Sequence, residues 1–105
     1  MALIGWSHTA KKQLVDIYTY YSTTANENIA NSFWSIIEEG TANLCNFPSL
    51  GKVDLKFSTD SIEYRFIIIA FGKQTFKMYY IIQGDMCIIQ ALRNCSQDDK
   101  TFVFI

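Results

Sequence analysis

The sequence feature that most constrains the fold is a group of three apolar segments between Ile62 and Arg93. Each segment is rich in β-branched and aromatic residues, which favour strands. In chain order, the segments are Ile62–Ala70, Thr75–Ile82 and Met86–Leu92. Short turn sequences around Gly72 and Gly84 separate them, and strands joined by such turns form consecutive hairpins. We therefore predict a three-stranded antiparallel β-meander here.

The first half of the chain supplies elements that can cover this meander. The apolar run Ala2–Trp6 predicts a first strand. After Ser7, a candidate N-cap, apolar residues recur at helical spacing until short polar residues after Tyr21 weaken the helix. Asn26 is the candidate N-cap of a second helix, which Pro48 ends. Because only about four residues join the two helices, they are expected to form an antiparallel hairpin.

The predicted fold class is therefore α+β, in the order β-α-α-β-β-β. It consists of an N-terminal strand, an antiparallel helical hairpin and an antiparallel β-meander, with the helices packed on one sheet face. Between the hairpin and the meander, Val53–Ser61 alternates apolar and polar residues, which indicates an extended segment or a short extra strand. With 105 residues, the chain (1–105) is expected to form a single domain.

Composition and charge argue against several classes of protein. A net charge of −1 and a pI near 5.7 disfavour strong non-specific binding to nucleic acid, which needs a basic surface. The longest apolar run, Phe66–Phe71, is far shorter than the roughly 20 residues of a membrane span. Half of the residues are hydrophobic, so the core needs no cofactor, metal or disulfide. Cys45, Cys87 and Cys95 lack metal-ligand spacing and are expected to be buried free thiols in a cytoplasmic protein.

Several local signatures follow one another in an order and at a spacing that point to a known family. They are Trp6-Ser7 with Ala10, then Asp16, Ile17, Tyr18, Tyr20 and Tyr21, then Ala30 and Phe33, then Leu44–Lys52, Arg65 and Lys77–Ile89. Together they resemble the RelE/ParE superfamily of bacterial toxins, which belong to type II toxin–antitoxin pairs. The resemblance covers roughly Ile4 to Asp99.

This resemblance implies a small cytoplasmic toxin of the plasmid-stabilisation kind, which inhibits growth and is neutralised by a cognate antitoxin encoded beside it. The antitoxin typically wraps an extended or helical segment around the toxin. The superfamily contains two activities. RelE-like members cleave mRNA in the ribosome with a basic and aromatic sheet surface, whereas ParE-like members act on DNA gyrase and lack that catalytic set.

The candidate catalytic residues for RNA cleavage are Arg65, Lys77 and Arg93. Cleavage by the 2′-OH needs basic groups that orient it, move protons and offset phosphate charge. Strand alternation lets Arg65, Lys77 and Tyr79 form a small polar patch if their faces coincide, with Arg93 near the end of the third strand. The patch depends on the strand register, because a slip of one residue moves a side chain to the other face.

Other features favour a ParE-like toxin that does not cleave RNA. After Arg93, Ser96, Gln97, Asp98 and Asp99 stand where a ribosome-dependent nuclease is expected to carry more basic or aromatic residues, and no Tyr or His follows Tyr80. We therefore favour the gyrase-directed activity. A ribosome-dependent mRNA endonuclease, a toxin that has lost its toxicity, and a non-toxic module that binds or dimerises through its sheet remain alternatives.

The meander also contains more apolar residues than one buried face can hold. Phe66 and Ile68 lie on one side of the first predicted strand, and Ile67 and Ile69 lie on the other. A helical hairpin covers only one face, and a large exposed apolar patch usually marks an interface. We predict that the other face is covered by an antitoxin segment, by the C-terminal residues Phe102–Ile105 or by a second copy in a homodimer.

Overall fold

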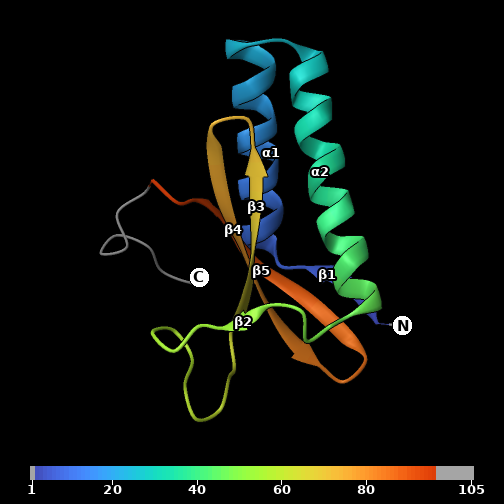
Figure 1. The fold of residues 1–105 in the computed structure, drawn as a ribbon, viewed down its shortest axis with the longest axis vertical. Helices are drawn as coiled ribbons and strands as arrows, with labels where there is room; N and C mark the ends of the chain where they lie inside the picture. Colours follow the sequence, from blue (N-terminus) through green and yellow to red (C-terminus); the bar gives the residue numbers. More distant parts are fainter. Residues whose placement is uncertain (1, 97–105) are drawn as a thin grey trace.

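A computed structural model of the protein describes residues 2–96, and its seven elements follow the predicted order (Figure 1). The elements are β1 (Leu3–Trp6), α1 (His8–Thr24), α2 (Glu27–Asn46), β2 (Lys52–Val53), β3 (Arg65–Phe71), β4 (Gln74–Gln83) and β5 (Met86–Asn94). The strands form one five-stranded sheet in the order β1-β5-β4-β3-β2. The predicted antiparallel meander is β3-β4-β5, and β1 pairs with β5 in parallel, so the sheet is mixed.

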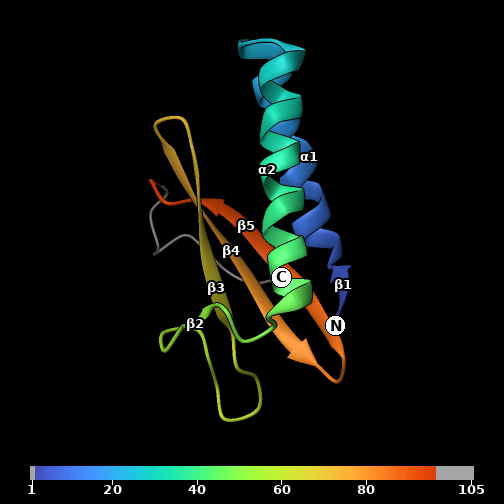
Figure 2. The ribbon, with the colours of Figure 1, turned by 45° about the vertical axis from the view of Figure 1, so that its right-hand side comes forward.

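Both helices begin where the sequence places an N-cap. The Ser7 hydroxyl accepts a hydrogen bond from the N–H of Ala10 at 3.1 Å, and the Asn26 side-chain oxygen accepts one from the N–H of Ile29 at 2.9 Å. Each bond satisfies a first-turn N–H that has no partner within the helix. The helices form an antiparallel hairpin that lies on one face of the sheet, as predicted (Figure 2).

The core lies between the helical hairpin and the β-meander. The ring of Phe33 in α2 is fully buried, and its centroid lies 5.5 Å from that of Phe71 and 5.3 Å from that of Phe76. Further along α2, a Cβ on Gly40 would lie 3.0 Å from Cδ1 of Ile69. Gly40 therefore lets α2 approach β3 closely, which offsets the cost of a glycine inside this helix.

Two tight turns set the register of the β-meander. Gly72 and Gly84 have φ values of 58° and 63°, in the left-handed region that glycine adopts without a steric penalty. Each turn has two residues, because Phe71 pairs with Gln74 and Gln83 pairs with Met86. The structure thus confirms both predicted hairpins.

The segment between α2 and β3 differs from its predicted form. Only Lys52–Val53 forms a strand, because the Asp54 carboxylate accepts hydrogen bonds from the N–H groups of Lys56 at 2.9 Å and Phe57 at 3.1 Å. Such a side-chain bond turns the backbone and overrides the alternating pattern of residues 53–61. The first strand of the meander likewise begins at Arg65 and not at Ile62.

One further expectation, that the cysteines are buried, is met only in part, and another concerns residues outside the described chain. Cys87 is buried, but Cys95 is exposed in the turn after β5, so the expectation of buried thiols is wrong for Cys95. Residues 102–105, a predicted cover for the second sheet face, lie outside the described residues. Within residues 2–96, no helix is both long enough and apolar enough to cross a membrane.

Candidate functional site

The strand register places the three candidate basic residues on two different faces of the sheet. Lys77 lies opposite Ile68 on β3 and opposite Arg93 on β5, so Lys77 and Arg93 share the sheet face that points away from the helices. Arg65 pairs with Tyr80 and lies on the helix-facing side. The predicted patch of Arg65, Lys77 and Tyr79 is therefore wrong for Arg65, which lies on the opposite sheet face from the other two residues. All three would share a face only if the β3–β4 register were shifted by one residue.

A β-bulge explains why Arg93 lies beside Lys77. Tyr79 pairs with Ala91, but the next residue of β4, Tyr80, pairs with Ile89, so Gln90 has no counterpart on β4. The extra residue reverses the alternation of side chains along β5. Without it, Arg93 would point toward the helices, as Ile89 does.

Arg65 holds the chain segment that leaves α2. Its guanidinium donates hydrogen bonds to the carbonyl oxygen of Gly51 at 2.9 Å and to that of Ser49 at 3.3 Å, and its Nε donates to the Glu63 carboxylate at 3.1 Å. Each bond restrains the Pro48–Gly51 turn or the start of β3. Arg65, a candidate catalytic residue in the sequence, thus forms hydrogen bonds that stabilise the fold.

Tyr80 completes this restraint from the centre of the sheet. Its hydroxyl donates to the carbonyl oxygen of Pro48 at 2.7 Å and accepts from the N–H of Gly51 at 2.8 Å. A Cβ on Gly51 would lie 2.7 Å from the carbonyl oxygen of Phe66, so this position needs glycine. Burial raises the pKa of Tyr80 above its usual 10.0, although the Gly51 N–H and the Arg65 charge oppose the shift. Pro48 and Gly51 form a Pro-x-x-Gly signature within the family-like segment Leu44–Lys52, and this signature therefore encodes the packing.

The face that points away from the helices is partly covered by the loop between β2 and β3. The Phe57 ring of this loop lies 5.9 Å from the buried Tyr79 ring, and the Tyr79 ring lies 5.8 Å from that of Phe66. The Lys77 ammonium lies 4.7 Å from the centroid of the Phe66 ring, a cation–π distance. Arg93 is only 3% exposed. Arg93 therefore presents little of its charge to solvent on this face, where Lys77 is half-buried.

Burial shifts the pKa of three titratable groups among the described residues. The one histidine, His8, is the first residue of α1, at the opposite edge of the sheet from β3. Burial raises the pKa of Tyr80, Tyr21 and the Cys87 thiol, which moves all three groups further from neutral pH. An efficient general acid or base needs a pKa near the working pH. In the part of the chain that the structure describes, no group of three or more His, Cys, Asp or Glu could hold a metal ion.

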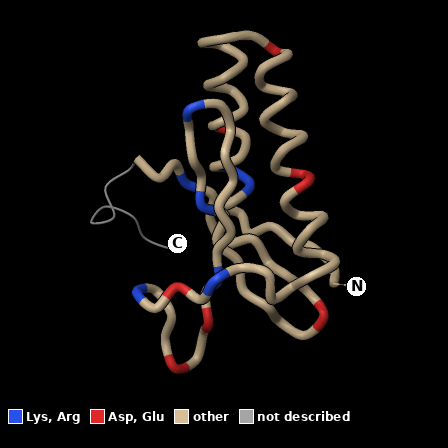
Figure 3. The backbone as a smooth tube through the Cα atoms, viewed as in Figure 1, with Lys and Arg blue, Asp and Glu red and all other residues tan. Residues whose placement is uncertain are grey.

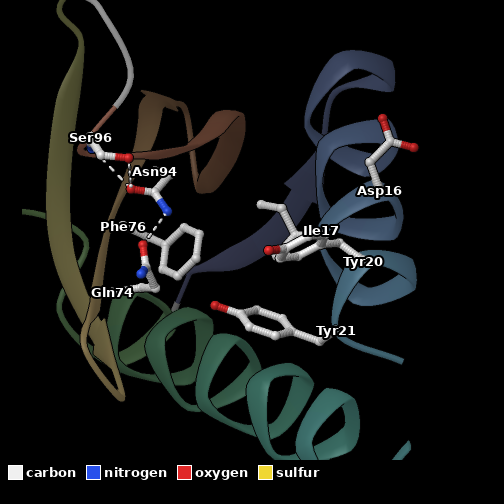
Figure 4. A pocket seen from close by; sticks show the side chains of 8 residues that line it. All are labelled: Asp16, Ile17, Tyr20, Tyr21, Gln74, Phe76, Asn94 and Ser96. Atoms are coloured by element: carbon white, nitrogen blue, oxygen red, sulfur yellow. Dashed lines mark hydrogen bonds between the residues drawn. The ribbon is translucent and has the colours of Figure 1, made fainter. Parts of the chain in front are cut away.

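Sequence reasoning missed a cavity of about 460 Å³ between α1 and the ends of β4 and β5 (Figure 4). Its lining residues are Asp16, Ile17, Tyr20, Tyr21, Gln74, Phe76, Asn94 and Ser96. The Asn94 amide donates to the Gln74 side-chain oxygen at 2.7 Å and thereby fixes both amides at the rim. Asp16, Ile17, Tyr20 and Tyr21 belong to the local signatures of the sequence, but no signal there indicated that they line a cavity with β4 and β5.

The comparisons with known proteins agree with this fold. The family model described as "ParE toxin of type II toxin-antitoxin system, parDE" matches residues 4–99. A solved structure, "Chromosomal ParDE TA system from P. aeruginosa", superposes with a TM-score of 0.66 at 16% sequence identity, covering 90% of this chain and 96% of that chain. Comparison with individual curated proteins gives no match.

A likeness at such low identity establishes the fold alone, whereas the family model spans nearly the whole described chain. ParE toxins pair with ParD antitoxins. The Pro48–Gly51 turn, the two hairpins and the helical hairpin that carried the resemblance are all present. The chain belongs to the family of ParE toxins and is the toxin component of a type II toxin–antitoxin system of the ParDE kind.

Proposed function

We propose that this ParE toxin arrests growth in the cytoplasm by binding DNA gyrase, and that it does not cleave RNA. The observation that carries the proposal is the commitment of the Arg65 guanidinium to the carbonyl oxygens of Gly51 and Ser49. Arg65 therefore cannot act together with Lys77 and Arg93, which lie on the other sheet face. Stabilising the transition state of phosphodiester cleavage needs several such groups aimed at one phosphate.

A surface suited to a protein target lies on the segments that flank β2. Four large apolar side chains there are exposed to solvent, and Leu55 is 88% exposed. They are Phe47, Leu50, Leu55 and Ile62. Exposed apolar side chains on loops are typical of protein-binding surfaces. We propose that the loop between β2 and β3 contributes to target recognition.

A supercoiling assay with purified gyrase tests this proposal. We expect the purified chain to inhibit supercoiling and to leave mRNA intact in a translation extract. Leu55→Ser removes an exposed apolar side chain and should weaken inhibition, whereas its unfolding free energy should change by less than about 0.5 kcal/mol. Lys77→Ala changes a residue of β4 outside this loop, so it is the control and should inhibit gyrase as the unaltered chain does.

The position of Lys77 opposite Arg93 supports a second candidate function, an mRNA endonuclease. This candidate predicts cleavage of mRNA on ribosomes and loss of cleavage in Lys77→Ala, with no effect on gyrase. That combination of results would overturn the gyrase proposal. Growth arrest on expression of the chain alone, relieved by the adjacent antitoxin gene, is expected in both cases.

A further inference from the structure

The cavity beside α1 lies where the chain leaves β5. Its lining residues include Asn94, at the end of β5, and Ser96, the last residue that the structure describes. The Asn94 side-chain oxygen accepts hydrogen bonds from the Ser96 N–H at 2.9 Å and from the Ser96 hydroxyl at 2.8 Å. Bonds of this kind form an Asx turn, which fixes the local backbone. The sequence that follows Ser96 therefore starts at the rim of the cavity.

Aromatic rings form much of the cavity wall. On α1, Tyr20 is 59% exposed, and its ring centroid lies 5.6 Å from that of Tyr21. The Tyr21 centroid lies 5.4 Å from that of Phe33, which lies 5.3 Å from that of Phe76 on β4. In Figure 4, the hydroxyls of Tyr20 and Tyr21 point from α1 toward the strands. The cavity thus extends the aromatic core outward, and a further ring in it would meet other rings at the spacing that aromatic pairs favour.

The charges around the cavity disfavour an ionic ligand. Asp16 is the one charged residue among the described lining residues, and its carboxylate lies 3.4 Å from the Lys12 ammonium. From Ile17 to Thr24, α1 carries no charged residue (Figure 3). Because the described lining contains no Lys or Arg, it offers little to a phosphate or a nucleic acid. An apolar, aromatic occupant matches these walls better.

The sequence after Ser96 supplies such an occupant. Residues 97–101 are polar, and the four residues after them are apolar: Phe102, Val103, Phe104 and Ile105. All of them lie outside the residues that the structure describes. Side chains alternate along an extended segment, so the rings of Phe102 and Phe104 would lie on one side, about 7 Å apart. These two rings are apolar groups that gain free energy when they leave water.

The size of the cavity agrees with this occupant. A sphere of 460 Å³ is about 10 Å across, which is wide enough for two rings about 7 Å apart. A cavity of about 150 Å³ holds one benzene molecule, so two rings need less than the volume present. The linking residues 97–101 span at most about 18 Å when extended, which exceeds the width of the cavity. The chain can therefore turn back and reach it.

We infer that Phe102 and Phe104 bind in this cavity, so that the segment after β5 folds back against α1 of the same chain. A tethered segment meets its site at an effective concentration in the millimolar range, which the segment of a second copy reaches only in concentrated solution. Phe76 packs on Phe33 of α2, so the cavity lies on the helix-facing side of the sheet. The segment would then leave the far sheet face uncovered. The inference does not depend on the cellular target.

NMR of the full chain tests the inference through the Ile17 side chain, which lines the cavity. We expect nuclear Overhauser cross-peaks between the Ile17 methyl groups and the ring protons of Phe102 and Phe104. The cross-peaks of each ring should disappear in its own variant, Phe102→Ala or Phe104→Ala. Val103→Ala is the matched control, because alternation directs this side chain away from the two rings, and it should keep both sets of cross-peaks.

A double-mutant cycle in thermal unfolding measures the contact independently. Tyr20→Ala and Phe104→Ala each remove one ring of the proposed contact, so the double variant loses that contact only once. It should therefore melt at least about 3 °C above the temperature that the two single shifts predict by addition. Tyr20→Ala combined with Val103→Ala is the matched control, and its shifts should add to within about 2 °C.

Several outcomes would overturn the inference. Absence of cross-peaks from Ile17 to both rings would place the segment elsewhere, and cross-peaks that persist in the Ala variants would assign the signals to other rings. Additive shifts in the cycle of Tyr20 and Phe104 would refute the packing of Phe104 on the cavity wall. Cross-peaks that arise only between labelled and unlabelled chains in a mixed sample would assign the cavity to the segment of a second copy.

Discussion

Replacing Tyr80 by Phe isolates the contribution of one hydroxyl to the turn that follows α2. The ring is fully buried, and Phe keeps its apolar contacts. The change removes the bond to the Pro48 carbonyl and leaves the buried N–H of Gly51 without its acceptor. The first loss costs about 1 kcal/mol and the second about 1–3 kcal/mol, so we expect Tyr80→Phe to lower the unfolding free energy by about 2–4 kcal/mol.

Urea unfolding followed by circular dichroism measures this difference, provided that the slope of the transition is unchanged. Tyr18→Phe is the matched control, because Tyr18 also donates one hydrogen bond, to the Asn31 side-chain oxygen at 2.8 Å, but on the exposed surface. It should cost less than about 1 kcal/mol, since water replaces the lost partner. If the two variants were equally stable, the Tyr80 hydroxyl would not hold the turn, and the structural role assigned to the Pro-x-x-Gly signature would be refuted.

The remaining predictions concern the same core and its response to pH. Gly51→Ala should destabilise the protein by at least about 2 kcal/mol in urea unfolding, because the added methyl group would lie 2.7 Å from the Phe66 carbonyl oxygen; a smaller loss would show that the turn can move. Phe33→Ala should cost about 3–5 kcal/mol in the same assay, since it empties the centre of the aromatic cluster formed with Tyr21, Phe71 and Phe76. Burial raises the pKa of Tyr80 above 10.0, so the folded state keeps a proton that the unfolded chain releases. The contribution of Tyr80 to stability should therefore be constant below pH 10.0 and fall as the pH rises through the raised value, and a Tyr80→Phe variant whose stability falls equally steeply would contradict this assignment.

Features determined by local chemistry could be predicted from the sequence. Ser7 and Asn26 are N-caps because their side chains reach N–H groups three residues ahead, and Gly72 and Gly84 mark turns because they adopt positive φ. The loop between β2 and β3 could not be predicted in this way. There, the side chain of Asp54 competes with the strand that the alternating pattern indicated.

The candidate site was less predictable, because it depends on non-local pairing. The faces of Arg65 and Lys77 follow from the β3–β4 register, and the face of Arg93 follows from the bulge at Gln90. No local residue preference marks that bulge in the sequence. The cavity beside Tyr20 and Tyr21 was missed for a related reason, since its walls come from α1, β4 and the end of β5.

The parallel pairing of β1 with β5 also controls when the toxin can fold during synthesis. The Ser7 hydroxyl donates to the carbonyl oxygen of Gln90, 83 positions later, and β5 is the one strand that pairs with β1 among residues 2–96. The N-terminal strand must therefore wait until nearly the whole chain has left the ribosome, and contacts between such distant residues form slowly. The sheet of the toxin therefore stays incomplete until β5 has been made.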